Sequence, residues 1–150
     1  MKVKNSMLLS TIYLIGGLAL ICFLGSCHQK IAAEMMPTTQ IVFGSGGGYA
    51  GSEKEFVLLE DGKIMEKQVG GKIYKSVARI GKTTSLQHYA QCDSLQIQKM
   101  AFQQPGNIYY YMIVKRNGQE NKVVWGNKDK PINDEVAQFY QQLADHLPKK

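Results

Sequence analysis

The sequence predicts an α+β domain, an antiparallel β-sheet of about five to six strands with two helices packed on one face. Three observations support this fold class. Short runs of strand-forming residues are separated by Asp-Gly, Gly-Gly and Asn-Gly turn signals. The apolar period changes to a helical one after residue 83 and again after residue 133. The order strands, helix, hairpin, helix is typical of sheets with helices on one side.

The first half of the domain is predicted to be a strand meander. Its strands are expected at residues 40–43, 53–60, 63–68 and 72–80. Asp61-Gly62 is a hairpin signal between the second and third of them, and Gly70-Gly71 is a turn before the fourth. Thr83 or Thr84 then caps a helix, and we expect Leu86, Tyr89 and Ala90 to share its buried face.

The second half contains the clearest strand, residues 108–115 ("IYYYMIVK"). It is apolar on both sides, which is typical of a strand in the middle of a sheet. Asn117-Gly118 predicts a hairpin turn, and residues 121–125 predict the returning strand. Asn133 is the expected cap of a last amphipathic helix. The apolar stripe of that helix consists of Val136, Tyr140, Leu143 and Leu147.

The first 26 residues have the features of an export signal. Lys2 and Lys4 precede an almost uninterrupted apolar run that ends in small residues. The segment Leu24-Gly25-Ser26-Cys27 resembles the lipobox of bacterial lipoproteins. This resemblance implies cleavage before Cys27 and acylation of that residue, so that the membrane is a partner through a lipid anchor. An ordinary signal peptide and an uncleaved anchor helix are the alternatives.

The predicted organisation is therefore a signal peptide at 1–26, a lipidated Cys and flexible tether at 27–39, and a single α+β domain at 40–150. We expect the protein in the bacterial cell envelope. His28 is not an acidic retention residue, which favours the outer membrane. After lipidation Cys92 remains alone, so no disulfide is expected within the chain. Cys92 is then either a small buried hydrophobe or a reactive thiol.

The net charge argues against nucleic-acid binding. It is +6, falling by two once Lys2 and Lys4 leave with the signal, and the basic residues are spread along the chain. A nucleic-acid surface needs basic residues concentrated on one face.

The segment "FGSGGGYAG" contains a literal G-x-G-x-x-G at residues 46–51. A dinucleotide site needs a helix directly after such glycines, but residues 53–60 predict a strand here. A P-loop lacks its closing Gly-Lys-Ser/Thr. Two explanations remain, a bend that needs positive φ and a loop that contacts a partner.

The aromatic residues are the other candidates for a surface that contacts a partner. Tyr49, Tyr109, Tyr111 and Trp125 either fill the core or form a recognition patch, since Tyr and Trp are common in binding hot spots. Tyr109 and Tyr111 are the best candidates for exposure. The predicted partner-binding residues are Gly46, Gly47, Gly48, Tyr49, Gly51, Tyr109 and Tyr111.

Catalytic groupings are sparse. Ser45 or Ser52 with His88 could suggest a triad, but no G-x-S-x-G elbow accompanies them. No His, Cys and Asp cluster has metal-ligand spacing. We therefore predict a non-enzymatic protein without cofactor or metal, which acts as a protein- or peptide-binding module. An accessory or structural lipoprotein is the alternative, and a small envelope enzyme is a weaker one.

One further resemblance concerns the domain. "IVFGSGGGYAG" is similar to the opening strand and glycine loop of the emfourins, small bacterial inhibitors of thermolysin-like metallopeptidases. "PGNIYYYMIVKRNG" and "KVVW" are similar to the later half of that pattern. The resemblance implies that residues 46–51 contact a peptidase. The chain departs from the pattern by an extra hairpin and a lipid anchor. It also looks like small lipoproteins of Bacteroidota-type bacteria with a G-S-G-G-G segment.

Overall fold

The structure is a computed structural model that describes residues 29–49 and 51–149. The predicted signal peptide and the predicted lipidation site, Cys27, lie outside the described residues.

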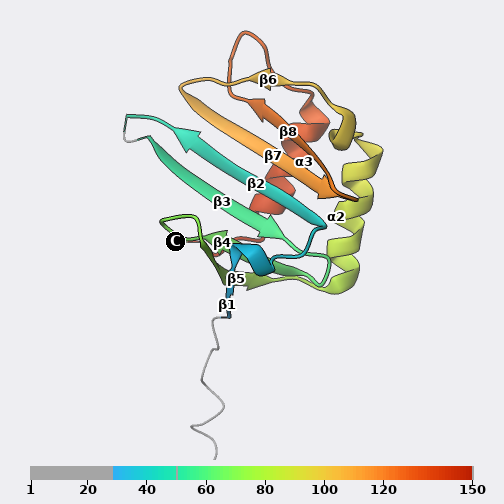
Figure 1. Cartoon of the computed structure of the whole chain (residues 1–150). Coiled ribbons are helices and arrows are strands. Elements are labelled where there is room, and N and C mark those ends of the chain that lie inside the picture. Colours follow the sequence, from blue (N-terminus) through green and yellow to red (C-terminus); the bar gives the residue numbers. More distant parts are fainter. Residues whose placement is uncertain (1–28, 50, 150) are drawn as a thin grey trace, which may run out of the picture.

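One eight-stranded sheet forms the body of the domain (Figure 1). Its spatial order is β1-β5-β4-β3-β2-β7-β8-β6. Neighbouring strands are antiparallel except β6 and β8, which are parallel. The strands are β1 (Lys30–Ala32), β2 (Gln40–Gly47), β3 (Ser52–Leu58), β4 (Lys63–Lys67), β5 (Ile73–Arg79), β6 (Gln103–Gln104), β7 (Ile108–Arg116) and β8 (Gln119–Trp125). The predicted α+β class is confirmed. The sheet has two more strands than the upper expectation, because β1 and β6 were not predicted.

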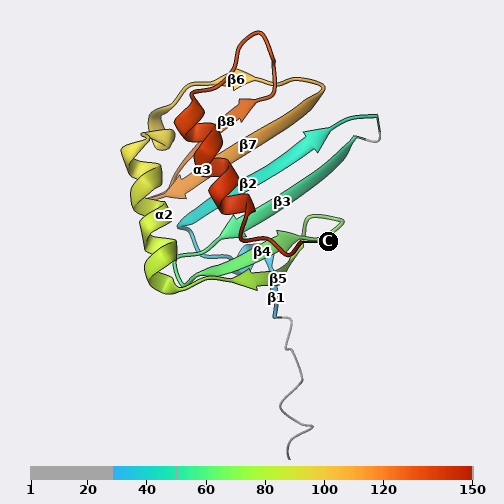
Figure 2. The same ribbon diagram turned by 180° about the vertical axis from the view of Figure 1, so that it is seen from behind.

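Both long helices cover the same face of the sheet (Figure 2). They are α2 (Lys82–Ser94) and α3 (Asp134–Ala144). α3 crosses the strands, whereas α2 runs along one end of the sheet. Two short 3₁₀ turns, η2 (Ala33–Met35) and η3 (Ile97–Lys99), complete the elements. The end of the sheet opposite α2 carries the hairpin between β2 and β3.

The main core lies between the sheet and the helices. Alternate residues of β2 and β7 point into it, for example Phe43 and Met112, which are cross-strand partners. From α3, Val136, Phe139 and Leu143 close it. The predicted stripe of α3 is thus confirmed at Val136 and Leu143, with Phe139 as its third buried residue.

α2 buries Tyr89 as predicted, but Leu86 and Ala90, the other residues of the predicted face, are exposed. Leu86 is 44% exposed, and the buried residues of the helix are Ser85, His88, Tyr89 and Cys92. The Ser85 hydroxyl donates to the Leu59 carbonyl at 2.7 Å, and the Tyr89 hydroxyl donates to the Leu58 carbonyl at 2.8 Å. These two buried hydrogen bonds, made to the last residue of β3 and to the residue after it, set the rotation of the helix, and apolar periodicity alone does not reveal them.

A second, smaller cluster lies on the helix-free face. Ile31 and Met36 pack against it, and its buried members are Val42, Val57, Leu59, Met65, Tyr111 and Val124. The prediction assigned residues 27–39 to a flexible tether. From Lys30 onward this segment instead belongs to the fold, because β1 pairs with β5 and brings Ile31 onto the sheet. Part of the segment that was predicted to be a tether therefore packs against the smaller cluster.

Candidate functional site

The glycine segment forms the end of the β2–β3 hairpin, not a phosphate loop. β2 continues through Gly47, which pairs with Ser52 at the start of β3. A strand, not a helix, therefore follows Gly51. The Gly51 amide donates to the Gly48 carbonyl at 3.1 Å and closes a four-residue turn. At this turn the backbone φ is +96° at Gly47, +75° at Gly48 and +58° at Gly51, a region that favours glycine.

Tyr49 stands at the tip of this turn with its side chain fully in solvent. Its relative exposure is 110%, the highest of the large hydrophobic residues among the described part of the chain. No packing requirement of the domain explains a tyrosine at this position, since the ring covers none of the core.

Two other glycines of the segment have a different role. Gly44 and Gly46 lie inside β2, directly opposite Tyr111 and Tyr109 of β7. A Cβ at Gly44 would come within 2.7 Å of the Tyr111 ring, and one at Gly46 within 2.5 Å of the Tyr109 hydroxyl. The tyrosine rings therefore lie flat over the glycine backbone on the helix-free face. The two rings are also neighbours, with centroids 6.3 Å apart.

The loop before β7 lies beside the hairpin tip. The Gly48 amide donates to the Asn107 carbonyl at 2.9 Å, and Gly47 pairs with Ile108. Ile108 is 57% exposed and Tyr110 is 39% exposed, although both are large and apolar. A hollow of 460 Å³ opens next to them, lined by residues 105–108 and 126–128. We call Gly47, Gly48, Tyr49, Gly51, Asn107, Ile108 and Tyr110 the hairpin end.

A trio of aromatic rings supports the hairpin end from the helix-covered face. Tyr110 stacks on Trp125 with centroids 6.0 Å apart, and Tyr140 of α3 meets both rings edge-on at 5.3 Å. Burial raises the pKa of Tyr140 to about 12, so its hydroxyl stays protonated. Contacts with Trp125 and Tyr140 therefore hold the Tyr110 ring in place, while part of the ring stays exposed to solvent.

On the helix-free face, the carboxylate of Glu55 positions two tyrosine rings, those of Tyr74 and Tyr111. The side chain of Glu55 is 11% exposed and lies 3.2 Å from the Lys67 Nζ. Its oxygens accept hydrogen bonds from the hydroxyls of Tyr74 at 3.0 Å and Tyr111 at 3.1 Å. Burial, and then the Glu55 charge, raises the pKa of Tyr74 to about 12 and the pKa of Tyr111 further still. Both hydroxyls therefore remain donors, and Glu55 has a positioning role under the hairpin.

These positions separate the predicted contact residues. Tyr49, Gly48 and Gly51 lie at the accessible tip, while Tyr109 is half-buried over Gly46. Tyr111 is completely buried and presents no surface. Trp125, at 8% exposure, fills the core. Sequence reasoning missed Ile108 and Tyr110, because a strand apolar on both faces gives no sign of where its helix cover stops.

The histidines do not form a catalytic grouping with serine. The Nε2 atoms of His88 and His146 are 3.0 Å apart, and Nδ1 of His88 is buried without a hydrogen-bond partner in the described structure. Within residues 29–149, neither His88 ring nitrogen contacts a hydroxyl. In the same part of the chain, no group of three or more His, Cys, Asp or Glu is placed to hold a metal ion.

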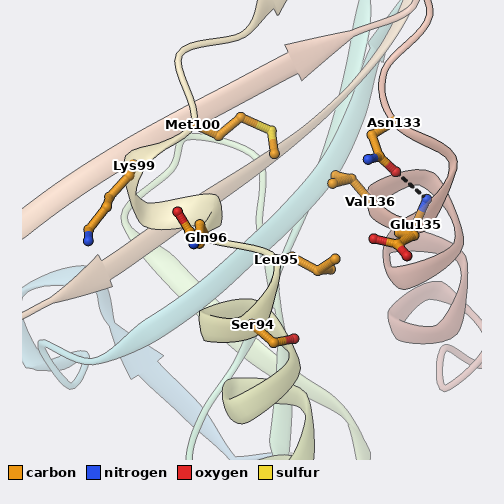
Figure 3. Close-up of a pocket in the computed structure, with 8 residues that line it drawn as sticks. All are labelled: Ser94, Leu95, Gln96, Lys99, Met100, Asn133, Glu135 and Val136. Carbon is orange, nitrogen blue, oxygen red and sulfur yellow. Dashed lines mark hydrogen bonds between the residues drawn. The ribbon is translucent and has the colours of Figure 1, made fainter.

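A second hollow, of 390 Å³, lies between the end of α2 and the start of α3 (Figure 3). Leu95 and Met100 point toward Val136 and form its apolar floor, while Lys99 points away. Asn133 is bound to the Glu135 amide, so its side-chain oxygen is engaged in capping α3. The eight residues that line this hollow include neither His nor Cys, and Glu135 is the one carboxylate among them.

Comparison with known proteins leaves the family open. No protein-family model matches this chain, and a search of curated proteins finds no match. No helix in the described residues is long and apolar enough to cross a membrane. The resemblances to lipoproteins and to emfourins therefore remain predictions.

Proposed function

We propose that this chain is an envelope lipoprotein, anchored through acylated Cys27, whose domain binds another protein or peptide through the hairpin end. The observation that carries the proposal is the fully exposed Tyr49 at the end of a hairpin whose strand β2 pairs with the part of β7 that contains the exposed Ile108 and Tyr110. Exposed apolar side chains that gather at one place mark interaction surfaces, and tyrosine is a frequent anchor in them. The domain itself performs no chemistry in this proposal.

The glycine turn suits such a role. It lies at the end of the β2–β3 hairpin, which projects from the end of the sheet opposite α2 (Figure 1). A narrow projection of this kind fits a concave partner surface, such as the cleft of a peptidase. The similarity of residues 41–51 to the emfourins makes a thermolysin-like metallopeptidase the first partner to test, with the domain as its inhibitor.

The partner test places a photo-crosslinking amino acid at Tyr49 of the full-length chain in its native membrane. Leu86 is the matched control, because it is also exposed but lies on α2 at the other end of the sheet. We expect crosslinked protein from position 49 and none of that species from position 86. Equal yields of the same species from both positions would remove the hairpin end as the binding surface.

The inhibitor form of the proposal has its own measurement. The acylated protein in detergent is titrated against thermolysin-like peptidases of the same envelope. We expect slowed peptide hydrolysis, and Tyr49→Ala should weaken it about tenfold or more while leaving unfolding within about 0.5 kcal/mol of wild type. No slowing at micromolar protein excludes inhibition. A position-49 crosslink without inhibition would favour the accessory lipoprotein.

A further inference from the structure

A second exposed apolar group lies at the β1 edge of the sheet. Val69, in the turn between β4 and β5, is 108% exposed, and Ile73 at the start of β5 is 46% exposed. Together with Lys30 and Lys72 they line a hollow of 280 Å³. Met35 of η2 is 76% exposed, and η2 is tied to this turn because the Ala33 amide donates to the Lys72 carbonyl at 2.9 Å. We call Lys30, Met35, Val69, Lys72 and Ile73 the edge patch.

The charge of the edge patch is positive. Within the described residues, neither Lys30 nor Lys72 takes part in an ion pair. Lys30 also stands directly opposite Lys75 in the sheet, and like charges in this position repel. The acids nearby are Glu34 in η2 and Glu66, which stands opposite Lys75 on β4. Glu53 and Glu55 line a separate hollow on the other side of Val69, where Glu55 is paired with Lys67. An anion bound at Lys30 would therefore relieve its repulsion with Lys75, and Lys72 lines the same hollow as Lys30.

The chain length places this patch close to the proposed lipid anchor. Cys27 precedes Lys30 by three residues, and an extended chain spans at most about 3.6 Å per residue. The two Cα atoms are therefore within about 11 Å of each other. A lipid on Cys27 ends in the hydrocarbon core, and the headgroup layer above that core is only about 5 to 8 Å thick. No room remains for a layer of partner protein between β1 and the bilayer.

We propose that the edge patch is a membrane-docking surface, which rests on a bilayer that contains anionic lipid. Lys30 and Lys72 bind headgroup phosphates. The apolar side chains enter the boundary between the headgroups and the acyl chains, and they are Val69, Ile73 and Met35. This combination of basic and apolar side chains is the one that interfacial segments use. The inference rests on the proposed acylation of Cys27.

Docking would fix the orientation of the whole domain. The strand order places β2 four strands away from β1, and strands are about 4.8 Å apart. The sheet would stand on its β1 edge, with the hairpin end about 19 Å above that edge and directed sideways (Figure 1).

The experiment uses the acylated full-length chain, one copy per lipid nanodisc, with Val69→Cys carrying a polarity-sensitive fluorophore. The thiol of Cys92 is buried and its pKa is raised to about 12, so it should not react, and labelling of the wild-type chain checks this. In discs of phosphatidylcholine with phosphatidylglycerol, we expect the emission to shift to shorter wavelength. Tyr49→Cys with the same label is the matched control and should show emission typical of water.

The charge is tested with Lys30→Gln and Lys72→Gln, each of which should lower the docked-to-undocked ratio about fivefold. Lys128→Gln, far from the patch in the loop after β8, should leave that ratio unchanged. A label at position 69 that stays in water on anionic discs overturns the docking surface. The docking surface is also overturned if the emission shift of this label increases with the number of protein copies per disc. That result would mean that the patch binds a second copy of the chain.

Mass spectrometry of the same preparation separates the two proposals. An acylated chain whose position-69 label stays in water refutes the docking surface and leaves the anchor intact. A chain without acyl groups on Cys27 refutes the anchor and, with it, the docking surface. Neither result bears on the hairpin end, which the crosslinking experiment tests independently.

Discussion

Gly44 and Gly46 have regular strand conformation, and a tyrosine ring takes the space that their side chains would fill. Gly47, Gly48 and Gly51 are glycine for another reason, because their φ angles are positive. One glycine-rich segment therefore serves two needs, ring packing in β2 and turn geometry at the tip. The sequence predicted the need for turn geometry. The need for ring packing arises only from the pairing of β2 with β7, which the sequence does not show.

This distinction can be measured at Gly46. We expect Gly46→Ala to lower the free energy of unfolding by about 1 to 3 kcal/mol, because the new Cβ overlaps the Tyr109 ring. In a Tyr109→Ala background, the same substitution should change it by less than about 0.5 kcal/mol. Urea unfolding of the four chains measures both effects. Equal losses in the two backgrounds would mean that the ring is not the obstacle.

The histidine pair predicts a dependence of stability on pH. Burial, and then the neighbouring His146, lowers the pKa of His88 below its ordinary value of about 6.5. The unfolded chain therefore binds a proton more readily than the folded chain does. The His88 contribution to stability is complete above pH 6.5, decreases as the pH falls below that value, and levels off below the lowered pKa.

Thermal unfolding between pH 7.5 and pH 5.5 measures this contribution. We expect the melting temperature of the wild-type chain to decrease over this interval. His88→Gln should be less stable at pH 7.5 but should show a flatter dependence on pH. Carboxylates titrate in both chains, so an identical pH dependence in the two would count against His88 as the source.

At the scale of elements, the start of α3 could be predicted from the local sequence alone. Asn133 was the predicted cap, and its side-chain oxygen accepts from the Glu135 amide at 2.7 Å. The first turn also contains Asp134 and Glu135, whose charges suit a helix N-terminus. We therefore expect Asn133→Ala to destabilise the chain by about 1 kcal/mol and Asn133→Asp to be nearly neutral.

Asn127 provides a matched control for that cap. Its side chain likewise accepts from a backbone amide two residues on, that of Asp129, but in an exposed loop where no helix begins. Asn127→Ala should therefore change the urea midpoint much less than Asn133→Ala. Similar changes from both would show that the loss comes from the local turn and not from the helix.

Other elements could not be predicted because their causes are tertiary. β6 has two polar residues, Gln103 and Gln104, and it exists because β8 offers a free edge in parallel. β1 has only three residues and lacks an alternating pattern long enough to recognise. The face of α2 depends on hydroxyl groups that reach the carbonyls of Leu58 and Leu59. Turn signals, by contrast, placed the β3–β4, β4–β5 and β7–β8 hairpins.

At the scale of the whole molecule, sequence reasoning placed a glycine bend between the first two strands but could not find its neighbours. Ile108 and Tyr110 join Tyr49 only through the pairing of β2 with β7. Tyr111 was expected as a contact and is buried instead, because Gly44 leaves space for its ring. Periodicity divides residues between two faces, but it does not show how far each face is covered.

The proposed anchor belongs to this scale because it would determine where the domain works. We expect Cys27→Ala to yield a chain that keeps its signal and carries no acyl groups. Intact mass, uptake of labelled palmitate and membrane fractionation measure this. Cys22→Ala is the matched control and should give the wild-type mature mass, since that residue is removed with the signal. Unchanged mass and unchanged fractionation in Cys27→Ala would contradict the anchor.

The outermost strands of the sheet, β1 and β6, are only three and two residues long. Proteins tethered to one surface collide far more often than the same proteins in free solution. Long bare strand edges would then template fibril growth from one molecule to the next. Edge strands as short as these offer little length for pairing with a strand of a neighbouring molecule, which disfavours edge-to-edge association.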